Sequence, residues 1–356
     1  MKTFKVIALT LLAALSFAAC DNDDPAEEPI IDPVLSDDVV ILNNGNWGSN
    51  DANLLSYNLV TEKTLPDFFM TANGKQLGDL GQDIVEATNG DYYIAVNGSQ
   101  LIFVTDKTMQ VKKEIVCTVD DSKLSPRSFC VSGDKVYVTY YEGYLGEIDT
   151  KSYGVRTTPV GLNPEGVTVA GGKLYVANSG GLNYENGYDN TVSVVDPKTF
   201  KEEKRITVNT NPQSVVASAD GQTLYVNSFG NYGDIPAKLQ SVSVASGEVV
   251  DLEYNDVKAI CAGAGDVLYV ATGSYDENWN VTGMVNIYDM KSRSAKGQLF
   301  ESAVTNYYSL SYSKGLVFVG ASDYKTNGDV YIYDEAGTLL RKIDAQGLNP
   351  QKGIRL

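Results

Sequence analysis

The sequence predicts an all-β fold, a seven-bladed β-propeller, from three observations. A pattern of four short strands recurs about every 45 residues, which is the length and content of one propeller blade. The apolar second strand of this pattern occurs seven times in the 356 residues. The chain ends in a half-repeat, residues 349–356, that begins like the other repeats and then stops. A lone terminal half-repeat favours a closed ring over an open β-solenoid.

The clearest repeat begins with Asn-Pro-Glu-Gly-Val at 163–167. Two strand-like runs follow, at 173–178 and 191–196, with a loop rich in Gly, Asn and Tyr between them. A fourth run lies at 204–208, and Asn-Pro-Gln-Ser-Val at 211–215 starts the pattern again. Four strands in one repeat indicate that each repeat forms one sheet.

The second strands are nearly continuous apolar runs, as expected for strands covered on both faces by neighbouring blades. They are expected at 39–43, 93–97, 136–139, 174–178, 224–227, 268–271 and 316–319. The third strands alternate and usually end in an aspartate that we expect to fix the following turn through local hydrogen bonds. These aspartates are Asp106, Asp149, Asp196, Asp289 and Asp334.

The two ends of the repeat region predict how the ring closes. The first unit, from about Val39 to Phe69, has three strands and lacks an opening one. We therefore expect the C-terminal strand to join the first blade, which leaves no large exposed sheet edge.

The N-terminal residues are typical of a lipoprotein precursor. Residues 1–19 combine Lys2 and Lys5 with an apolar stretch too short to span a bilayer, so we expect a signal peptide. Cys20 follows a lipoprotein-like cleavage box and is the expected lipidation site. Residues 20–37 are acidic and contain prolines, which predicts a flexible tether before the propeller at 38–356.

The acidic run directly after Cys20 resembles the surface-export signal of Bacteroidetes lipoproteins. That resemblance implies a protein on the outer face of the outer membrane, held there by acyl chains alone.

The composition excludes several classes of function. The chain has no histidine, which removes histidine-based catalytic triads, general bases and metal ligands. The net charge of −17 disfavours nucleic acid as a partner. The sequence contains no phosphate-binding loop and no zinc-type cysteine spacing, so we expect no metal, no cofactor and no catalytic residue. Cys117, Cys130 and Cys261 lie in apolar strand patterns and are expected to be buried free thiols.

Two sets of loops are expected on one face of the ring, beside its central channel. The first set leads into each blade, and aligning the Asn-Pro motif places one residue per blade at the channel mouth. These residues are Gln82, Arg127, Glu165, Gln213, Lys258, Tyr308 and Gln351. The second set joins the second and third strands. Its longest members cover 44–51, 140–144, 179–189, 228–234, 272–280 and 322–328.

The second set of loops is rich in Tyr, Trp, Asn, Ser and Gly, the composition of a recognition surface. From it we select residues for stacking or edge contact with a ligand: Trp47, Tyr141, Tyr184, Phe229, Tyr232, Tyr275, Trp279 and Tyr324. From the channel mouth we select Arg127, Gln213 and Tyr308 for polar contacts.

The motifs Leu-Tyr-Val-Ala-Asn, Val-Ser-Val-Val-Asp-Pro and Asn-Pro-Gln-Ser-Val resemble those of the YncE-type seven-bladed propellers over nearly all of 38–356. With Cys20, the acidic tether and the Asn-rich loop at 43–50, the chain is similar to the BtuG type of Bacteroides surface lipoproteins. This resemblance implies capture of cobalamin as a bound ligand rather than a cofactor, and its delivery to a TonB-dependent outer-membrane transporter.

Three other functions fit the same residues. A surface glycan binder would present similar aromatic platforms, and a protein-interaction platform would need no small ligand. A lactonase-like or lyase-like enzyme is disfavoured because only oxygen-ligand or carboxylate chemistry remains without histidine. Fold alone does not decide among them.

Overall fold

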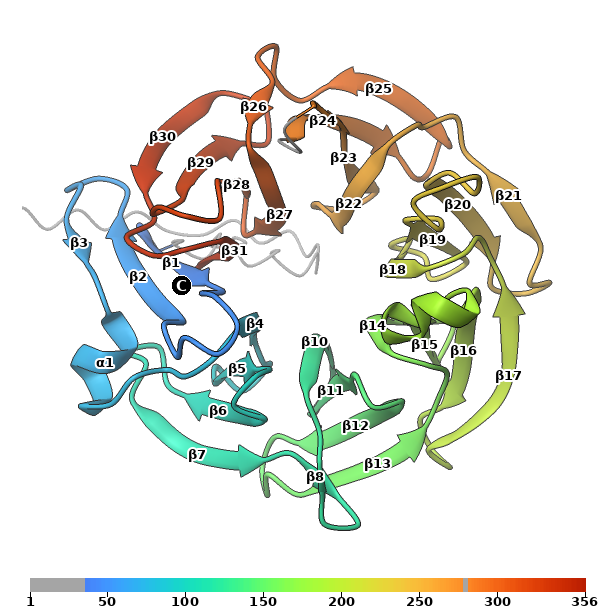
Figure 1. Ribbon diagram of the computed structural model, residues 1–356, viewed down its shortest axis with the longest axis horizontal. Helices are drawn as coiled ribbons and strands as arrows, with labels where there is room; N and C mark the ends of the chain where they lie inside the picture. The colour runs from blue at the N-terminus through green and yellow to red at the C-terminus, as the bar shows by residue number, and fades with distance from the viewer. Residues whose placement is uncertain (1–35, 278–280) are drawn as a thin grey trace, which may run out of the picture. The chain divides into compact units, whose positions relative to one another are not determined.

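A computed structural model describes residues 36–277 and 281–356, and these residues form a ring of seven antiparallel sheets, six with four strands and one with five (Figure 1). The innermost strands surround the central channel. They are β31 (Pro350–Arg355), β4 (Gly81–Glu86), β10 (Pro126–Ser132), β14 (Pro164–Ala170), β18 (Pro212–Ala217), β22 (Val257–Ala262) and β27 (Tyr307–Ser313). The sequence prediction of an all-β seven-bladed propeller is confirmed.

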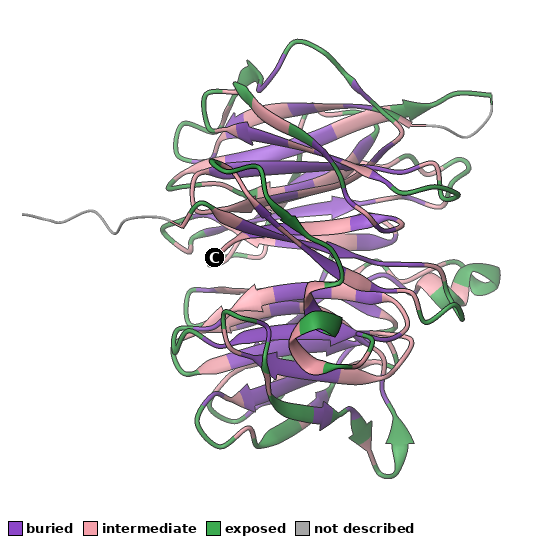
Figure 2. Cartoon of the chain, turned by 90° about the vertical axis from the view of Figure 1, so that its left-hand side faces the viewer, coloured by how far each residue is buried: buried purple, intermediate pink, exposed green. Residues whose placement is uncertain are grey.

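The second strands match the seven predicted runs and are almost wholly buried (Figure 2). They are β1 (Asp38–Asn43), β5 (Tyr92–Val96), β11 (Lys135–Tyr140), β15 (Lys173–Asn178), β19 (Thr223–Ser228), β23 (Val267–Tyr275) and β28 (Leu316–Ala321). Their side chains pack between adjacent blades, so the hydrophobic core consists of clusters arranged around the ring.

The third strands are β2 (Asn53–Asn58), β6 (Leu101–Thr105), β12 (Tyr144–Asp149), β16 (Thr191–Asp196), β20 (Lys238–Ser243), β24 (Val281–Asp289) and β29 (Asp329–Asp334). The outer strands are β3 (Thr64–Leu65), β7 (Val111–Val116), β13 (Val155–Pro159), β17 (Lys201–Thr207), β21 (Val249–Asp251), β25 (Ser294–Gln298) and β30 (Leu339–Asp344). Outside this pattern are α1 (Phe68–Asn73), the 3-10 helix η1 (Gly181–Asn186), the hairpin β8 (Thr118–Val119) and β9 (Ser122–Lys123), and β26 (Val304–Thr305).

The ring closes as the sequence predicts. β31 pairs antiparallel with β1, with Ile41 opposite Gly353, and supplies the missing inner strand of the first blade. The backbone N–H of Leu356 also donates to the carbonyl of Asp38 at 3.0 Å. The first unit differs from expectation at its end, where Phe69 belongs to α1 and buries its ring against Phe103 of the next blade.

The third-strand aspartates fix the turns into the outer strands, as predicted. The carboxylate of Asp149 accepts hydrogen bonds from the backbone N–H groups of Lys151 and Ser152, and Asp196 accepts those of Lys198 and Thr199. Asp106, Asp289 and Asp334 accept equivalent bonds. Hydrogen bonds from the side chains of Lys135 and Lys173, together with these backbone bonds, hold the pKa values of Asp149 and Asp196 well below the usual range.

One loop prediction is wrong in part. Residues 272–275 were expected in a loop but continue β23, which pairs with β24 as far as Tyr275 opposite Val281. The longer hairpin follows from Thr272, Tyr275 and Val281, because β-branched and aromatic residues favour strands. Tyr275 is therefore presented by an extended hairpin rather than by a loop.

Candidate functional site: the central cavity and its rim

The loops that lead into the blades, here called lead-in loops, lie on the same face as the loops between second and third strands. In each blade, an N–H at or just after the end of the second strand donates to the carbonyl of the last lead-in residue. The pairs are Asn44 to Asn349, Asn97 to Leu80, Tyr141 to Ser125, Ser179 to Asn163, Phe229 to Asn211, Gly273 to Asp256 and Ser322 to Asn306. Both sets of loops therefore form a single face, which is on the right in Figure 2.

The lead-in motif has a conformational reason. Six of the seven residues whose carbonyls accept these hydrogen bonds adopt a left-handed backbone, with φ between 44° and 62°. Four of these six residues are asparagines: Asn163, Asn211, Asn306 and Asn349. Asparagine tolerates this conformation better than most residues because its short polar side chain hydrogen-bonds locally. The Asn-Pro motif thus turns the chain into the innermost strand.

A cavity of about 610 Å³ occupies the centre of the ring. It is lined by the innermost strands, and all seven residues predicted at the channel mouth line it. These are Gln82, Arg127, Glu165, Gln213, Lys258, Tyr308 and Gln351. The alignment of the repeats therefore placed one side chain per blade correctly.

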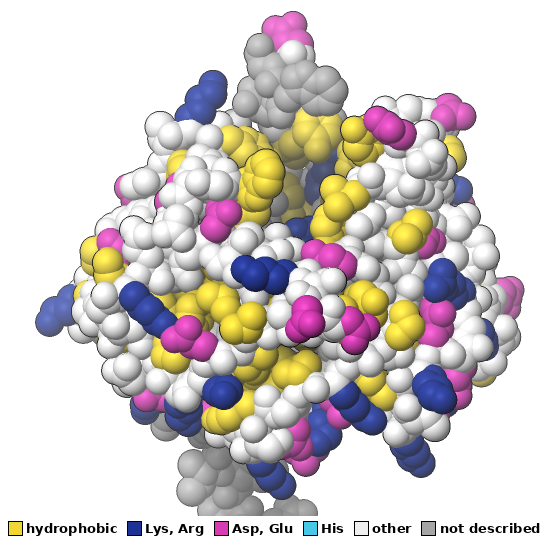
Figure 3. All heavy atoms as spheres, turned by 60° about the horizontal axis from the view of Figure 1, so that its bottom comes forward, with side chains coloured by type: hydrophobic (Ala, Val, Ile, Leu, Met, Phe, Trp, Pro, Cys, Tyr) yellow, Lys and Arg dark blue, Asp and Glu magenta, His cyan; other side chains and the backbone are white. Residues whose placement is uncertain are grey.

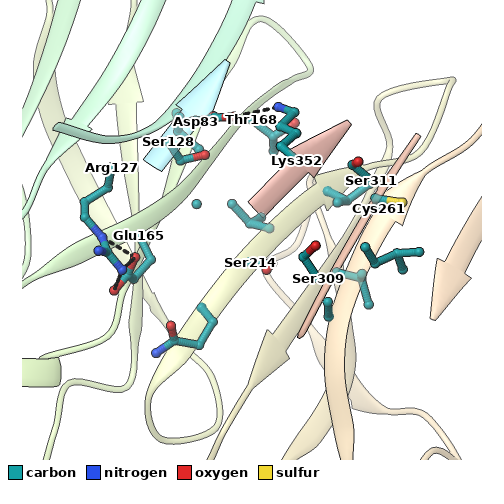
Figure 4. A pocket seen from close by; sticks show the side chains of 18 of the residues that line it. Asp83, Arg127, Ser128, Glu165, Thr168, Ser214, Cys261, Ser309, Ser311 and Lys352 are labelled. Atoms are coloured by element: carbon teal, nitrogen blue, oxygen red, sulfur yellow. Dashed lines mark hydrogen bonds and ion pairs between the residues drawn. The ribbon is translucent and has the colours of Figure 1, made fainter. Parts of the chain in front are cut away.

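Two ion pairs cross this lining (Figure 4). Arg127 makes a bidentate pair with Glu165, with Nε–Oε2 and Nη2–Oε1 distances of 2.8 and 2.9 Å. One residue further along the innermost strands, Lys352 Nζ lies 2.6 Å from Asp83 Oδ1. Each pair joins two neighbouring blades, so both pairs position side chains and link adjacent sheets along the cavity wall.

The Arg127–Glu165 pair is largely shielded from solvent. Burial raises the pKa of Glu165, and the guanidinium of Arg127 opposes that shift. Arg127 also donates from Nη1 to Gln82 Oε1 at 3.1 Å and lies over the ring of Tyr141, 4.8 Å from its centroid. Arg127 and Tyr141, both predicted site residues, are thus brought together at the cavity mouth.

Further predicted aromatic residues surround the same cavity. Tyr308 lines it, and its ring meets that of Tyr324 edge-on, with centroids 5.6 Å apart. Phe229 also lines it and contacts Tyr232 edge-on at 6.4 Å. Lys258 Nζ lies 4.1 Å from the centroid of Tyr275. The predicted residue Gln213 lines the cavity beside them.

Two predicted residues lie on this face without a contact to the cavity lining among the described residues. Trp47 is 83% exposed in the loop after β1, and Tyr184 is 61% exposed in η1. Trp279 and Cys20, the predicted lipidation site, lie outside the described residues. The face therefore combines a lined cavity with an outer rim of exposed aromatic side chains.

Sequence reasoning did not select some residues that the geometry brings to the site. Asp83 and Lys352 line the cavity and pair with each other. Each follows a predicted mouth residue directly, so extending the repeat alignment by one position would have found both. Tyr188 contacts Tyr232 edge-on at 6.2 Å and belongs to the predicted loop 179–189.

The three cysteines within the described residues are free, as expected, but only Cys117 is fully buried. Cys130 and Cys261 are half-buried, and Cys261 lines the cavity. The expectation of burial is wrong for these two, and for Cys261 the reason is that the innermost strands have one side open to the channel. Burial nevertheless raises the pKa of Cys130 to about 11 and that of Cys261 to about 12, so neither thiol is ionised near neutral pH.

On the face drawn in Figure 3, acidic and basic side chains are interspersed. Within the described residues, no group of three or more Cys, Asp or Glu side chains is arranged to hold a metal ion.

No described helix is long and apolar enough to cross a membrane.

Comparisons with known proteins identify the fold. No family model and no curated protein matches the chain. Hydrazine synthase of Kuenenia stuttgartiensis is 18% identical, with a TM-score of 0.56 over 73% of this chain and 80% of that chain.

Two further solved structures are comparably similar. The computationally designed Ika8 protein is 12% identical, with a TM-score of 0.55 over 87% of this chain and 88% of that chain. A chain of a mitotic checkpoint complex is 13% identical, with a TM-score of 0.55 over 74% and 79%. At such identities the likeness concerns architecture alone, and what this chain shares with these structures is the β-propeller fold.

Proposed function

We propose that this protein is a cell-surface lipoprotein of the YncE-like, BtuG type that captures cobalamin or another corrinoid. It binds the ligand without changing it chemically and passes it to a TonB-dependent outer-membrane transporter. The observation that carries the proposal is the polar central cavity surrounded by tyrosines on one face of a closed ring.

The chemistry of the ligand suits that face. A corrin ring offers a broad apolar surface fringed by amides, and a nucleotide tail extends from it. Aromatic rings such as Tyr324 and Tyr232 offer contact area, and Gln82, Gln213 and Gln351 offer amide donors and acceptors. The cavity volume falls within the range of small-molecule sites and suits part of such a ligand.

The closed ring favours tight binding. Its loops are tied to the lead-in residues by the same backbone bond in every blade, so little order has to be gained when the ligand binds. Many modest contacts then sum to high affinity.

The path of the chain suits surface display. β1 runs toward the site face, because the loop that follows Asn43 lies on that face. Ser36, the first described residue, precedes β1 and therefore lies toward the opposite face. The described chain therefore begins away from the cavity mouth, as the proposal of an N-terminal anchor requires.

The proposal is tested by mixing the purified protein with cobalamin, desalting it, and measuring retained cobalamin by its visible absorbance. Isothermal titration then compares wild type with Trp47→Ala, Tyr232→Ala and Tyr324→Ala. Loss of one aromatic contact is expected to weaken binding by about 5- to 30-fold, since such contacts contribute about 1–2 kcal/mol.

Val60→Ala is the matched control. Val60 is 68% exposed in the turn between β2 and β3, on the opposite face, and its loss should leave the affinity unchanged. A protein that retains no cobalamin contradicts the proposed function. Binding of oligosaccharides instead, with the same sensitivity to Tyr232→Ala and Tyr324→Ala, would establish the glycan-binding alternative.

A further inference from the structure

The ionisable side chains that line the central cavity do not balance. Two carboxylates, Asp83 and Glu165, face three cations, Arg127, Lys258 and Lys352. Arg127 is paired with Glu165 and Lys352 with Asp83. Lys258 therefore has no carboxylate partner in the cavity lining, although the net charge of the protein is −17.

Lys258 has no carboxylate within 4.0 Å among residues 36–277 and 281–356. Its ammonium group instead lies over the ring of Tyr275, 4.1 Å from the centroid. The side chain is half-buried, and burial lowers its pKa, an effect that Asp256 opposes. A half-buried ammonium group that lacks a paired carboxylate is a strong partner for an incoming anion, because folding has already removed part of its hydration shell and the attraction is stronger in a partly buried site than in water.

Neutral donors lie in the same ring of mouth residues. Gln213 and Gln351 line the cavity with Lys258, and each side-chain amide can donate two hydrogen bonds. The amide of Gln213 already donates to Asn211, whereas no hydrogen bond occupies the amide of Gln351 among the described residues. An oxyanion beside Lys258 would therefore find a cation and at least one amide donor in the same cavity.

We propose that the cavity mouth is a subsite for one negatively charged oxyanion of the ligand, with Lys258 as its ionic partner. The identity of the ligand that bears this oxyanion rests on the proposed function. Cobalamin has one such group, the phosphodiester of its nucleotide tail. The tail would enter the cavity, and the corrin ring would lie outward against the aromatic rim.

The test titrates cobalamin and cobinamide, a corrinoid that lacks the nucleotide and its phosphate, against wild type and Lys258→Met. The substitution is expected to weaken cobalamin binding by about 10- to 100-fold, the usual contribution of a hydrogen bond to a charged group. Cobinamide binding should not change. Lys258→Arg keeps the charge and should restore most of the cobalamin affinity.

Lys342→Met is the matched control. Lys342 also lies over an aromatic ring, that of Tyr331 at 5.2 Å, but it is exposed on the outer strand β30. Its removal should affect neither ligand. Circular dichroism and thermal unfolding of each variant check that the propeller is intact.

The possible results separate this inference from the proposed function. If Lys258→Met binds cobalamin like wild type, or loses cobinamide equally, the anion subsite is wrong although corrinoid capture stands. If wild type binds no corrinoid, the proposed function fails, and titration with inorganic phosphate decides the subsite. Saturable phosphate binding that Lys258→Met abolishes would support it, and absence of saturable binding would overturn it.

Discussion

At the scale of single residues, the Arg127–Glu165 pair has the largest consequences for the cavity. It couples the inner strands of two blades and also holds Gln82 and the ring of Tyr141. The side chain of Glu165 is only 11% exposed, so its carboxylate depends on Arg127 for compensation. Removing one member of a buried pair is usually worse than removing both.

Arg127→Met is therefore expected to lower the free energy of unfolding by about 2–4 kcal/mol at pH 7. The loss should be smaller near pH 4. Burial already raises the pKa of Glu165 above its ordinary value of 4.5, and removal of the guanidinium raises it further. A raised folded-state pKa gives stability at low pH that is lost as pH rises through it. Urea unfolding at pH 4 and pH 7 measures the difference.

Arg205→Met provides the control for this prediction. Arg205 pairs with Glu202 on the outer strand β17, where the side chains are 42% and 25% exposed. An exposed pair contributes about 1 kcal/mol or less, so this variant should change stability little. An equal loss in both variants, or a loss for Arg127→Met that does not depend on pH, would show that burial of Glu165 is not the cause.

At the scale of elements, the lead-in asparagines connect neighbouring blades. Asn163 donates from Nδ2 to the carbonyl of Tyr141 in one blade and accepts from the N–H of Leu182 in the next. Asn349 also joins two blades at the closure, but in the reverse sense: its Nδ2 donates to the carbonyl of Gly45 in its own blade, and its Oδ1 accepts from the hydroxyl of Ser322 in the preceding blade. Asn163 and Asn349 thus combine a left-handed backbone with a clamp between two loops of the site face.

Substitutions at Asn163 separate these two roles. Asn163→Gly removes the clamp but tolerates φ of 44°, and should cost about 1–2 kcal/mol for two hydrogen bonds. Asn163→Ala adds backbone strain of about 1 kcal/mol and should be the less stable variant. Chemical denaturation compares them, and equal stability of the two variants would contradict a role for the left-handed backbone.

The repeats made the strands, the turn aspartates and the mouth residues predictable, because each depends on local pattern and on its place in a repeat. The pairing of Arg127 with Glu165 and of Lys352 with Asp83 was not predictable, since the repeat places side chains around the channel without fixing which ones meet. The extension of β23 to Tyr275 was missed because a Gly-containing polar segment reads as a loop. Helix α1 was missed because it lies outside the repeated unit.

At the scale of the whole molecule, stability depends on seven blades forming an uninterrupted ring. β31 packs on both β1 and the preceding blade, where Ser311 Oγ donates to the carbonyl of Gly353 at 3.1 Å. Deletion of residues 350–356 is expected to abolish the folded monomer. The deletion would leave the inner edge of β1 unpaired, and such edges associate with one another.

Size-exclusion chromatography and thermal unfolding measure the effect of this deletion. A synthetic peptide of residues 350–356, added during refolding, should restore a monomeric fraction, whereas a peptide of scrambled order should not. A truncated protein that stays monomeric with an unchanged melting temperature would show that the first blade does not need β31.

The pairing of β1 with β31 also constrains biogenesis. The N-terminal blade is synthesised first but can be finished only when the last residues of the chain arrive. During synthesis the nascent polypeptide would therefore carry an incomplete sheet until residues 350–356 have been added. A chaperone that masks that sheet would act on this protein for as long as β31 is missing.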